Sequence, residues 1–160
     1  MKTIIGIMGG GEKASQIDKN NAYELGRYIA SKGFVTLTGG RNIGVMNEAL
    51  RGAKENSGIT LGILPNDDKE SFSEYLDIPV ITNMRSGRNY INALSSDLLI
   101  ICGVELGTSS EISLGLKAGK KVILVGLYKE ANIFYKKLAP EQVYIANNYD
   151  EAIKHFNTLI

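Results

Sequence analysis

The sequence has little cysteine and little histidine, with one residue of each among 160. The single Cys102 excludes a disulfide framework and predicts a reducing, cytoplasmic setting. The lone His155 excludes a metal centre built from histidines, so no metal ligands are predicted. No apolar run reaches the length that spans a membrane, and no export signal follows Met1. We therefore expect a cytoplasmic protein without a membrane partner.

The chain also lacks an excess of charge of either sign, with 18 Lys and Arg against 17 Asp and Glu and a formal net charge of +1. Proteins that bind nucleic acid through its backbone usually carry a strong basic excess, so nucleic acid is not an expected partner. Hydrophobic residues make up 44% and charged residues 22%, which is typical of a globular domain. A single domain over residues 1–160 is predicted.

Short apolar runs alternate with segments of helical periodicity along the whole chain. The predicted strands are 3–8, 34–38, 59–64, 78–82, 97–102, 121–125 and 143–145. The predicted helices are 15–32, 43–56, 88–96, 109–118, 132–138 and 150–159. Most of these strands are apolar throughout, which favours a parallel sheet covered on both faces. The fold class is therefore α/β, a Rossmann-like, doubly wound and mainly parallel sheet of about seven strands.

Three details of this pattern are more specific. The first helix should bury one face made of Ile17, Ala22, Leu25 and Ile29. Pro79 places the strand 78–82 near an edge of the sheet. The acidic segment 66–77 is the longest irregular connection, and we expect a mobile lid or an interface loop there.

Glycines gather at the carboxyl ends of the predicted strands, where ligands of doubly wound sheets bind. The candidate residues for holding a phosphate are Gly9, Gly10, Gly11, Gly39, Gly40, Arg41, Gly44, Gly107 and Thr108. The run 9–14 also fits the dinucleotide fingerprint G-x-G-x-x-A, but the second strand ends without the acidic residue that holds a ribose hydroxyl, so a redox dinucleotide is not expected. Plain turns and close helix–sheet packing are the structural alternatives for these glycines.

Thr108 and Glu111 have the spacing of a capping box, T-x-x-E, in which the carboxylate only stabilises a helix start. Arg88 favours a different interpretation. It is expected in the first turn of its helix, where the helix dipole disfavours a cation. A residue placed against its local electrostatics is a candidate for binding a phosphate or carboxylate, so the two interpretations of Glu111 both stay open.

Taken together, Gly39-Gly40, Gly44-Val45-Met46, Arg88-Asn89, Asp97 and the stretch Gly107-Thr108-x-x-Glu111 resemble the LONELY GUY (LOG)-like proteins, which share a Rossmann-like fold with the DNA-processing protein DprA. The resemblance covers nearly the whole chain. In that family an Arg and the Glu of P-G-G-x-G-T-x-x-E are the proposed catalytic pair that cleaves the N-glycosidic bond of nucleoside 5′-monophosphates. The resemblance implies that Arg88 and Glu111 are catalytic if this chain is an enzyme.

Two departures point to a sister branch of that family. Gly103-Val104-Glu105 stands in place of Pro-Gly-Gly, and Asn89 stands where the cytokinin-activating enzymes have Lys. The shorter branch includes molybdenum cofactor carrier proteins, which hold a phosphate-bearing pterin without reaction. The resemblance thus implies a homo-oligomer, a dimer or a tetramer, that binds a phosphorylated small molecule, with Asn89 among the ligand residues and the molybdenum cofactor as cargo. A nucleoside monophosphate phosphoribohydrolase and a nucleotide-sensing module are the alternatives.

Overall fold

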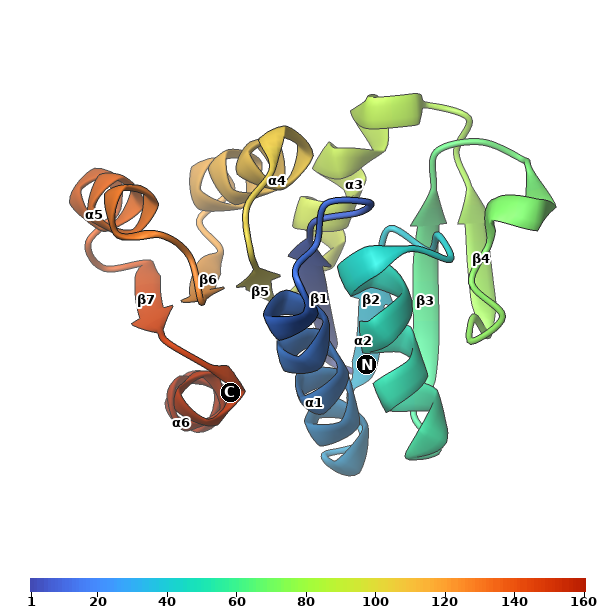
Figure 1. Cartoon of the computed structure of the whole chain (residues 1–160), viewed down its shortest axis with the longest axis horizontal. Helices are drawn as coiled ribbons and strands as arrows, with labels where there is room; N and C mark the ends of the chain where they lie inside the picture. The colour runs from blue at the N-terminus through green and yellow to red at the C-terminus, as the bar shows by residue number, and fades with distance from the viewer.

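The computed structural model describes residues 1–160 as a seven-stranded sheet between two layers of helices. The strands are β1 (Ile4–Gly9), β2 (Val35–Thr38), β3 (Ile59–Leu64), β4 (Ile78–Ile81), β5 (Leu98–Cys102), β6 (Lys121–Val125) and β7 (Val143–Ala146). The helices are α1 (Gln16–Ser31), α2 (Gly44–Glu55), α3 (Arg88–Ser95), α4 (Leu106–Lys117), α5 (Lys129–Leu138) and α6 (Tyr149–Leu159), with short 3₁₀ turns at Lys69–Ser71 and Arg85–Gly87. Figure 1 shows the strands in a twisted row with β4 at one end and β7 at the other.

All strand pairs are parallel, in the order β4-β3-β2-β1-β5-β6-β7. Strands β1 to β4 therefore follow one another to one edge of the sheet. The chain then crosses back to β5 beside β1 and continues through β6 and β7 to the other edge. Such a switch in strand order leaves a crevice at the carboxyl ends of the two central strands. The predicted α/β fold with a parallel sheet is confirmed, and β4 lies at the edge.

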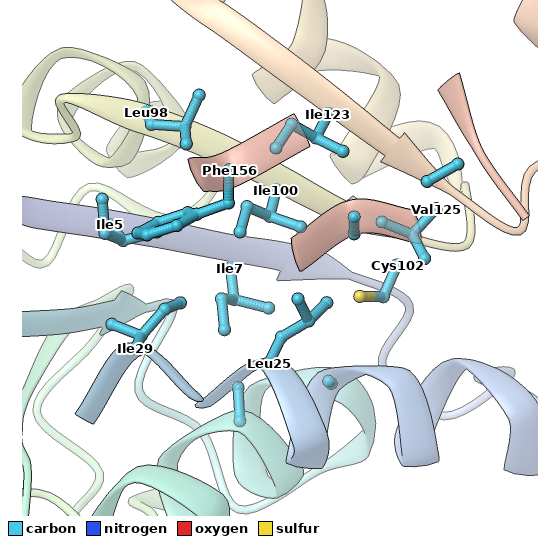
Figure 2. Close-up of a cluster of buried hydrophobic side chains, with 14 of the residues drawn as sticks. Ile5, Ile7, Leu25, Ile29, Leu98, Ile100, Cys102, Ile123, Val125 and Phe156 are labelled. Carbon is cyan, nitrogen blue, oxygen red and sulfur yellow. The ribbon is translucent and has the colours of Figure 1, made fainter. Parts of the chain in front are cut away.

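Two separate apolar cores hold the layers together. On one face, side chains of β1, β5 and β6 pack against α1, α2 and α6, with Leu25, Ile29 and Phe156 meeting the sheet (Figure 2). On the other face, α3, α4 and α5 cover a second cluster that includes Ile101 and Ile112. Because central strands contribute to both clusters, their residues are apolar in an unbroken run.

Two local expectations need correction. Helix α4 begins at Leu106, three residues earlier than the predicted start at 109. Ile17 is 70% exposed, because it lies in the first turn of α1, whereas Ala22, Leu25 and Ile29 are buried as predicted. Cys102 is fully buried in the first core, where burial raises the pKa of its thiol and the nearby Asp18 adds to the effect.

The acidic segment 66–77 is tied to the rest of the fold. Phe72 forms an antiparallel bridge with Arg41. The Asp77 carboxylate accepts hydrogen bonds from the Thr60 backbone N–H and hydroxyl and pairs with Lys54. These contacts favour a fixed wall behind Arg41 over the mobile lid that the composition suggested.

Helices α1 and α2 cross at a point where only glycine fits. A Cβ atom on Gly26 would lie 2.1 Å from the backbone oxygen of Ala49. In an exposed helix, Gly→Ala stabilises by about 1 kcal/mol, but forced overpacking costs about 1–3 kcal/mol. We therefore expect Gly26→Ala to lower the free energy of unfolding, measured by urea denaturation. Gly107→Ala is the matched control, because its Cβ would meet nothing closer than 3.9 Å, and equal behaviour of the two variants would contradict this packing.

Candidate functional site

A cavity of about 540 Å³ opens at the carboxyl ends of β1, β2 and β5. It lies where the strand order reverses between β1 and β5, the usual ligand position in doubly wound sheets. The loop after β1, the loop after β2 and the first turns of α3 and α4 bring together residues from distant parts of the chain. The predicted site residues that line it are Gly9, Gly11, Gly39, Arg41, Arg88, Asn89, Gly107, Thr108 and Glu111.

Arg88 projects from the first turn of α3 into the cavity, as its position in the sequence predicted. Its Nη1 donates a hydrogen bond to the carbonyl of Ile63 at 3.0 Å, while its buried Nε has no partner. The guanidinium lies against Gly39, where a Cβ atom would be 2.0 Å from Nη1. Burial lowers the pKa of Arg88, Glu111 opposes this and Arg41 adds to it. A guanidinium remains charged under these conditions, so the site holds a partly desolvated cation.

Glu111 is 6% exposed and accepts a hydrogen bond from the Asn92 side-chain nitrogen at 2.7 Å. No salt bridge neutralises it, and burial raises the pKa of its carboxyl, opposed by Asn92 and then by Arg88. The capping-box interpretation of Thr108 and Glu111 is wrong. Since α4 begins at Leu106, Thr108 is already its third residue, and Glu111 lies in the second turn facing α3.

The N-terminus of α4 is open toward the cavity. Leu106, Gly107 and Thr108 form its first turn and line the cavity, and no side chain caps the helix. The first N–H groups of a helix have no partner within it and carry the positive end of the dipole, so they bind anions. By contrast, the N-terminus of α1 is closed by its own capping box, in which Ser15 and Asp18 bond to each other's backbone. Of these two helices, α4 is therefore the one whose first N–H groups stay uncapped beside the cavity.

Three of the predicted ligand residues, Gly10, Gly40 and Gly44, do not line the cavity. A Cβ on Gly44, whose φ is +55°, would lie 2.2 Å from the carbonyl oxygen of Gly11. A Cβ on Gly40, whose φ is +75°, would lie 3.1 Å from the Cα of Gly62, and one on Gly10 would lie 2.5 Å from the Glu105 carboxylate. Close packing against backbone and a positive φ account for Gly40 and Gly44, whereas the atom nearest to a Cβ on Gly10 is the end of a flexible side chain.

The Asn89 side chain joins α3 to α4. Its nitrogen donates hydrogen bonds to the Gly107 carbonyl at 3.3 Å and to the Ser110 hydroxyl at 2.8 Å. Asn89 is 8% exposed but lines the cavity. It therefore fixes the open turn of α4 relative to Arg88, the residue beside it.

Sequence reasoning missed several residues that line the cavity: Met8, Glu12, Lys13, Met46, Glu105 and Leu106. Glu12 and Lys13 directly follow the first glycine loop, a signal that could have placed them. The lining thus carries three cations and three carboxylates: Lys13, Arg41, Arg88, Glu12, Glu105 and Glu111. None of the cations forms a salt bridge, so all three are available to an anionic ligand.

The parallel sheet, its switch point and the open helix N-terminus in one cavity with a half-buried arginine define a Rossmann-like domain with a cavity at its switch point. The chain belongs to the SLOG cluster4 family, whose model matches residues 2–153. It is also 42% identical over 118 residues to an uncharacterised protein of Archaeoglobus fulgidus, covering 74% of this chain and 76% of that protein. The resemblance stated from the sequence is therefore confirmed at the level of the family.

Two solved structures extend this comparison over the whole chain. The molybdenum cofactor binding protein of the phototrophic bacterium Rippkaea orientalis is 45% identical, with a TM-score of 0.94 over 99% of this chain and 97% of that one. The molybdenum cofactor carrier protein of Chlamydomonas reinhardtii is 42% identical, with a TM-score of 0.95 over 99% and 98% of the two chains. No helix of this chain is both long and apolar enough to cross a membrane.

Proposed function

We propose that this protein binds a phosphorylated pterin, the molybdenum cofactor, and carries it as cargo. The single observation that carries the proposal is that the open N-terminus of α4 and the half-buried Arg88 line one cavity. The close likeness to solved structures of a cofactor-binding protein and a cofactor carrier supports the choice of ligand.

The residues of the cavity fit a phosphate group. The unbonded N–H groups at Leu106–Thr108 supply fixed donors, and Arg88 and Arg41 supply charge. Gly39 leaves the space that Arg88 fills, and Asn89 holds α4 in place. The structure thus offers both the donors and the support that a phosphate requires, with the rest of the cavity open to the remainder of the ligand.

Glu111 has a different role in this proposal from the catalytic role that the LOG-like resemblance implies. It is held by Asn92, away from water, at the back of the cavity. We propose that it shapes and tunes the site without cleaving a bond. The charge of its carboxylate opposes an incoming anion, so binding is tuned by the protonation of this group.

The test is retention of the cofactor by the purified protein. We expect the protein, incubated with isolated molybdenum cofactor and separated from free ligand, to retain molybdopterin that is detected by fluorescence after oxidation. A parallel screen of nucleoside monophosphates, cytokinin forms included, should release no free base. Absence of retained molybdopterin would contradict the proposal, and release of a base would favour the phosphoribohydrolase.

A further inference from the structure

A second cavity of about 500 Å³ adjoins the first, between α4 and the start of α5. Glu105 and Leu106 line both cavities. Leu106 is 94% exposed and Glu105 is half-buried, so neither residue at the boundary between the two cavities belongs to a packed core. A ligand that occupies the first cavity can therefore extend into the second across Leu106.

The two cavities differ in chemistry. The first is lined by glycines and charged groups and has no aromatic side chain. The second is mainly hydrophobic and contains Tyr128, Phe134 and Tyr135. A planar heterocycle binds best against aromatic faces, because stacking is favourable for any ring with a π face. The surface suited to a ring thus lies beside the surface suited to a phosphate.

Two aromatic side chains of the second cavity, Tyr135 and Phe134, contact neighbouring side chains. Tyr135 is 4% exposed, and its hydroxyl lies 2.6 Å from the Ser109 hydroxyl on α4. The ring of Phe134 meets that of Tyr135 edge to face, with centroids 5.1 Å apart and planes at 74°. Phe134 itself is 60% exposed, so much of this aromatic side chain is accessible to a ligand.

We infer that this groove between α4 and α5 is the ring subsite of the phosphorylated ligand. The phosphate sits at the N-terminus of α4, and the heterocycle packs against Phe134 and Tyr128. The part of the ligand that joins phosphate and ring crosses Leu106. The inference rests on the proposed function and deepens it by naming the surface that recognises the ring. It also assigns a role to large exposed side chains that the phosphate site does not use.

A third cavity, on the other side of α4, is the competing position for the ring. It shares Asn89, Leu106 and Gly107 with the first cavity, and its aromatic lining is Tyr90 alone. A single side chain gives less stacking surface than the cluster on α5. Tyr90 is 50% exposed and is therefore a suitable comparison in the experiment.

The experiment measures the affinity of the molybdenum cofactor by equilibrium dialysis, together with its displacement by inorganic phosphate. Phe134→Ala should weaken cofactor binding by about tenfold, within the range for removal of a stacking aromatic side chain. The inhibition constant of phosphate should stay unchanged, because phosphate has no ring. Ile133→Ala is the matched control, since Ile133 is the neighbouring residue, is 55% exposed and does not line the groove. Tyr90→Ala should also leave both constants unchanged.

Failure of this inference is distinguishable from failure of the proposed function. If the unaltered protein retains no cofactor, the proposed function is wrong and the ring subsite falls with it. If the cofactor is retained and phosphate displaces it, but Phe134→Ala behaves like Ile133→Ala, only the ring subsite is wrong. If phosphate no longer competes in Phe134→Ala, the substitution has disturbed the fold. If the molecular mass of this variant in solution changes, the groove serves self-association. Either result would also overturn the inference.

Discussion

Arg88→Met is expected to weaken binding of the cofactor by about 10- to 100-fold, because hydrogen bonds to charged groups contribute about 1.5–3 kcal/mol. Arg88 is a partly buried cation that lines the cavity and forms no salt bridge. Methionine keeps an unbranched stem of similar length but removes the charge and the donors. The measurement is the dissociation constant of the cofactor, again by dialysis and fluorescence.

Arg85→Met is the matched control for this variant. Arg85 lies in the 3₁₀ turn just before α3, is exposed and does not line the cavity. The Arg85→Met variant should bind the cofactor as the unaltered protein does. If both variants lose affinity equally, the effect is one of general charge, and the placement of Arg88 at the phosphate is wrong.

Glu111→Gln should increase affinity for the cofactor several-fold at neutral pH. The carboxylate shares the cavity with the expected phosphate, and like charges at a partly buried site repel each other. Glutamine keeps an oxygen that accepts from Asn92 but carries no charge. If the protein is instead an enzyme that uses Glu111 for chemistry, the unaltered protein should turn over its substrate and Glu111→Gln should not. The same variant therefore separates the carrier from the phosphoribohydrolase.

The same substitution has a second readout in the stability of the fold. Burial raises the pKa of Glu111 above its ordinary value, so the folded protein binds this proton more tightly than the unfolded chain does. The contribution of this group to stability falls as the pH rises from the ordinary carboxyl range through the raised pKa. The stability of Glu111→Gln relative to the unaltered protein should therefore increase as the pH rises above the ordinary carboxyl range.

Urea denaturation at acidic pH and at neutral pH checks this expectation. Glu12→Gln serves as the control, because Glu12 lines the same cavity but is exposed. It should show no such growth. A pH-independent difference between Glu111→Gln and the unaltered protein would mean that folding does not raise the pKa of Glu111.

Much of the fold could be predicted because its local signals agree with one another. The predicted strands 59–64 and 121–125 coincide with β3 and β6, and Pro79 correctly placed β4 at an edge. The start of α4 was wrong because Thr108 and Glu111 have the spacing of a capping box, whereas the helix begins at Leu106 without any cap. Tertiary contacts between Asn89 and α4 hold the start of this helix in place, while its first N–H groups stay uncapped.

The site could be predicted in outline and not in detail. The glycines and Arg88 pointed to one crevice because the carboxyl ends of parallel strands meet at one edge of the sheet. The sequence could not separate Gly39, which borders the cavity, from Gly40 and Gly44, which are needed for backbone packing. Nor could it find Asn92, whose contact with Glu111 depends on how α3 and α4 lie against each other.

The most direct test of the account is a crystal structure of the protein grown with the molybdenum cofactor. The account predicts the phosphate beside the N–H groups of Leu106–Thr108 and within hydrogen-bond distance of Arg88. A phosphate bound elsewhere, for example at the glycine loop Gly9–Gly11 and away from both α4 and Arg88, would contradict it.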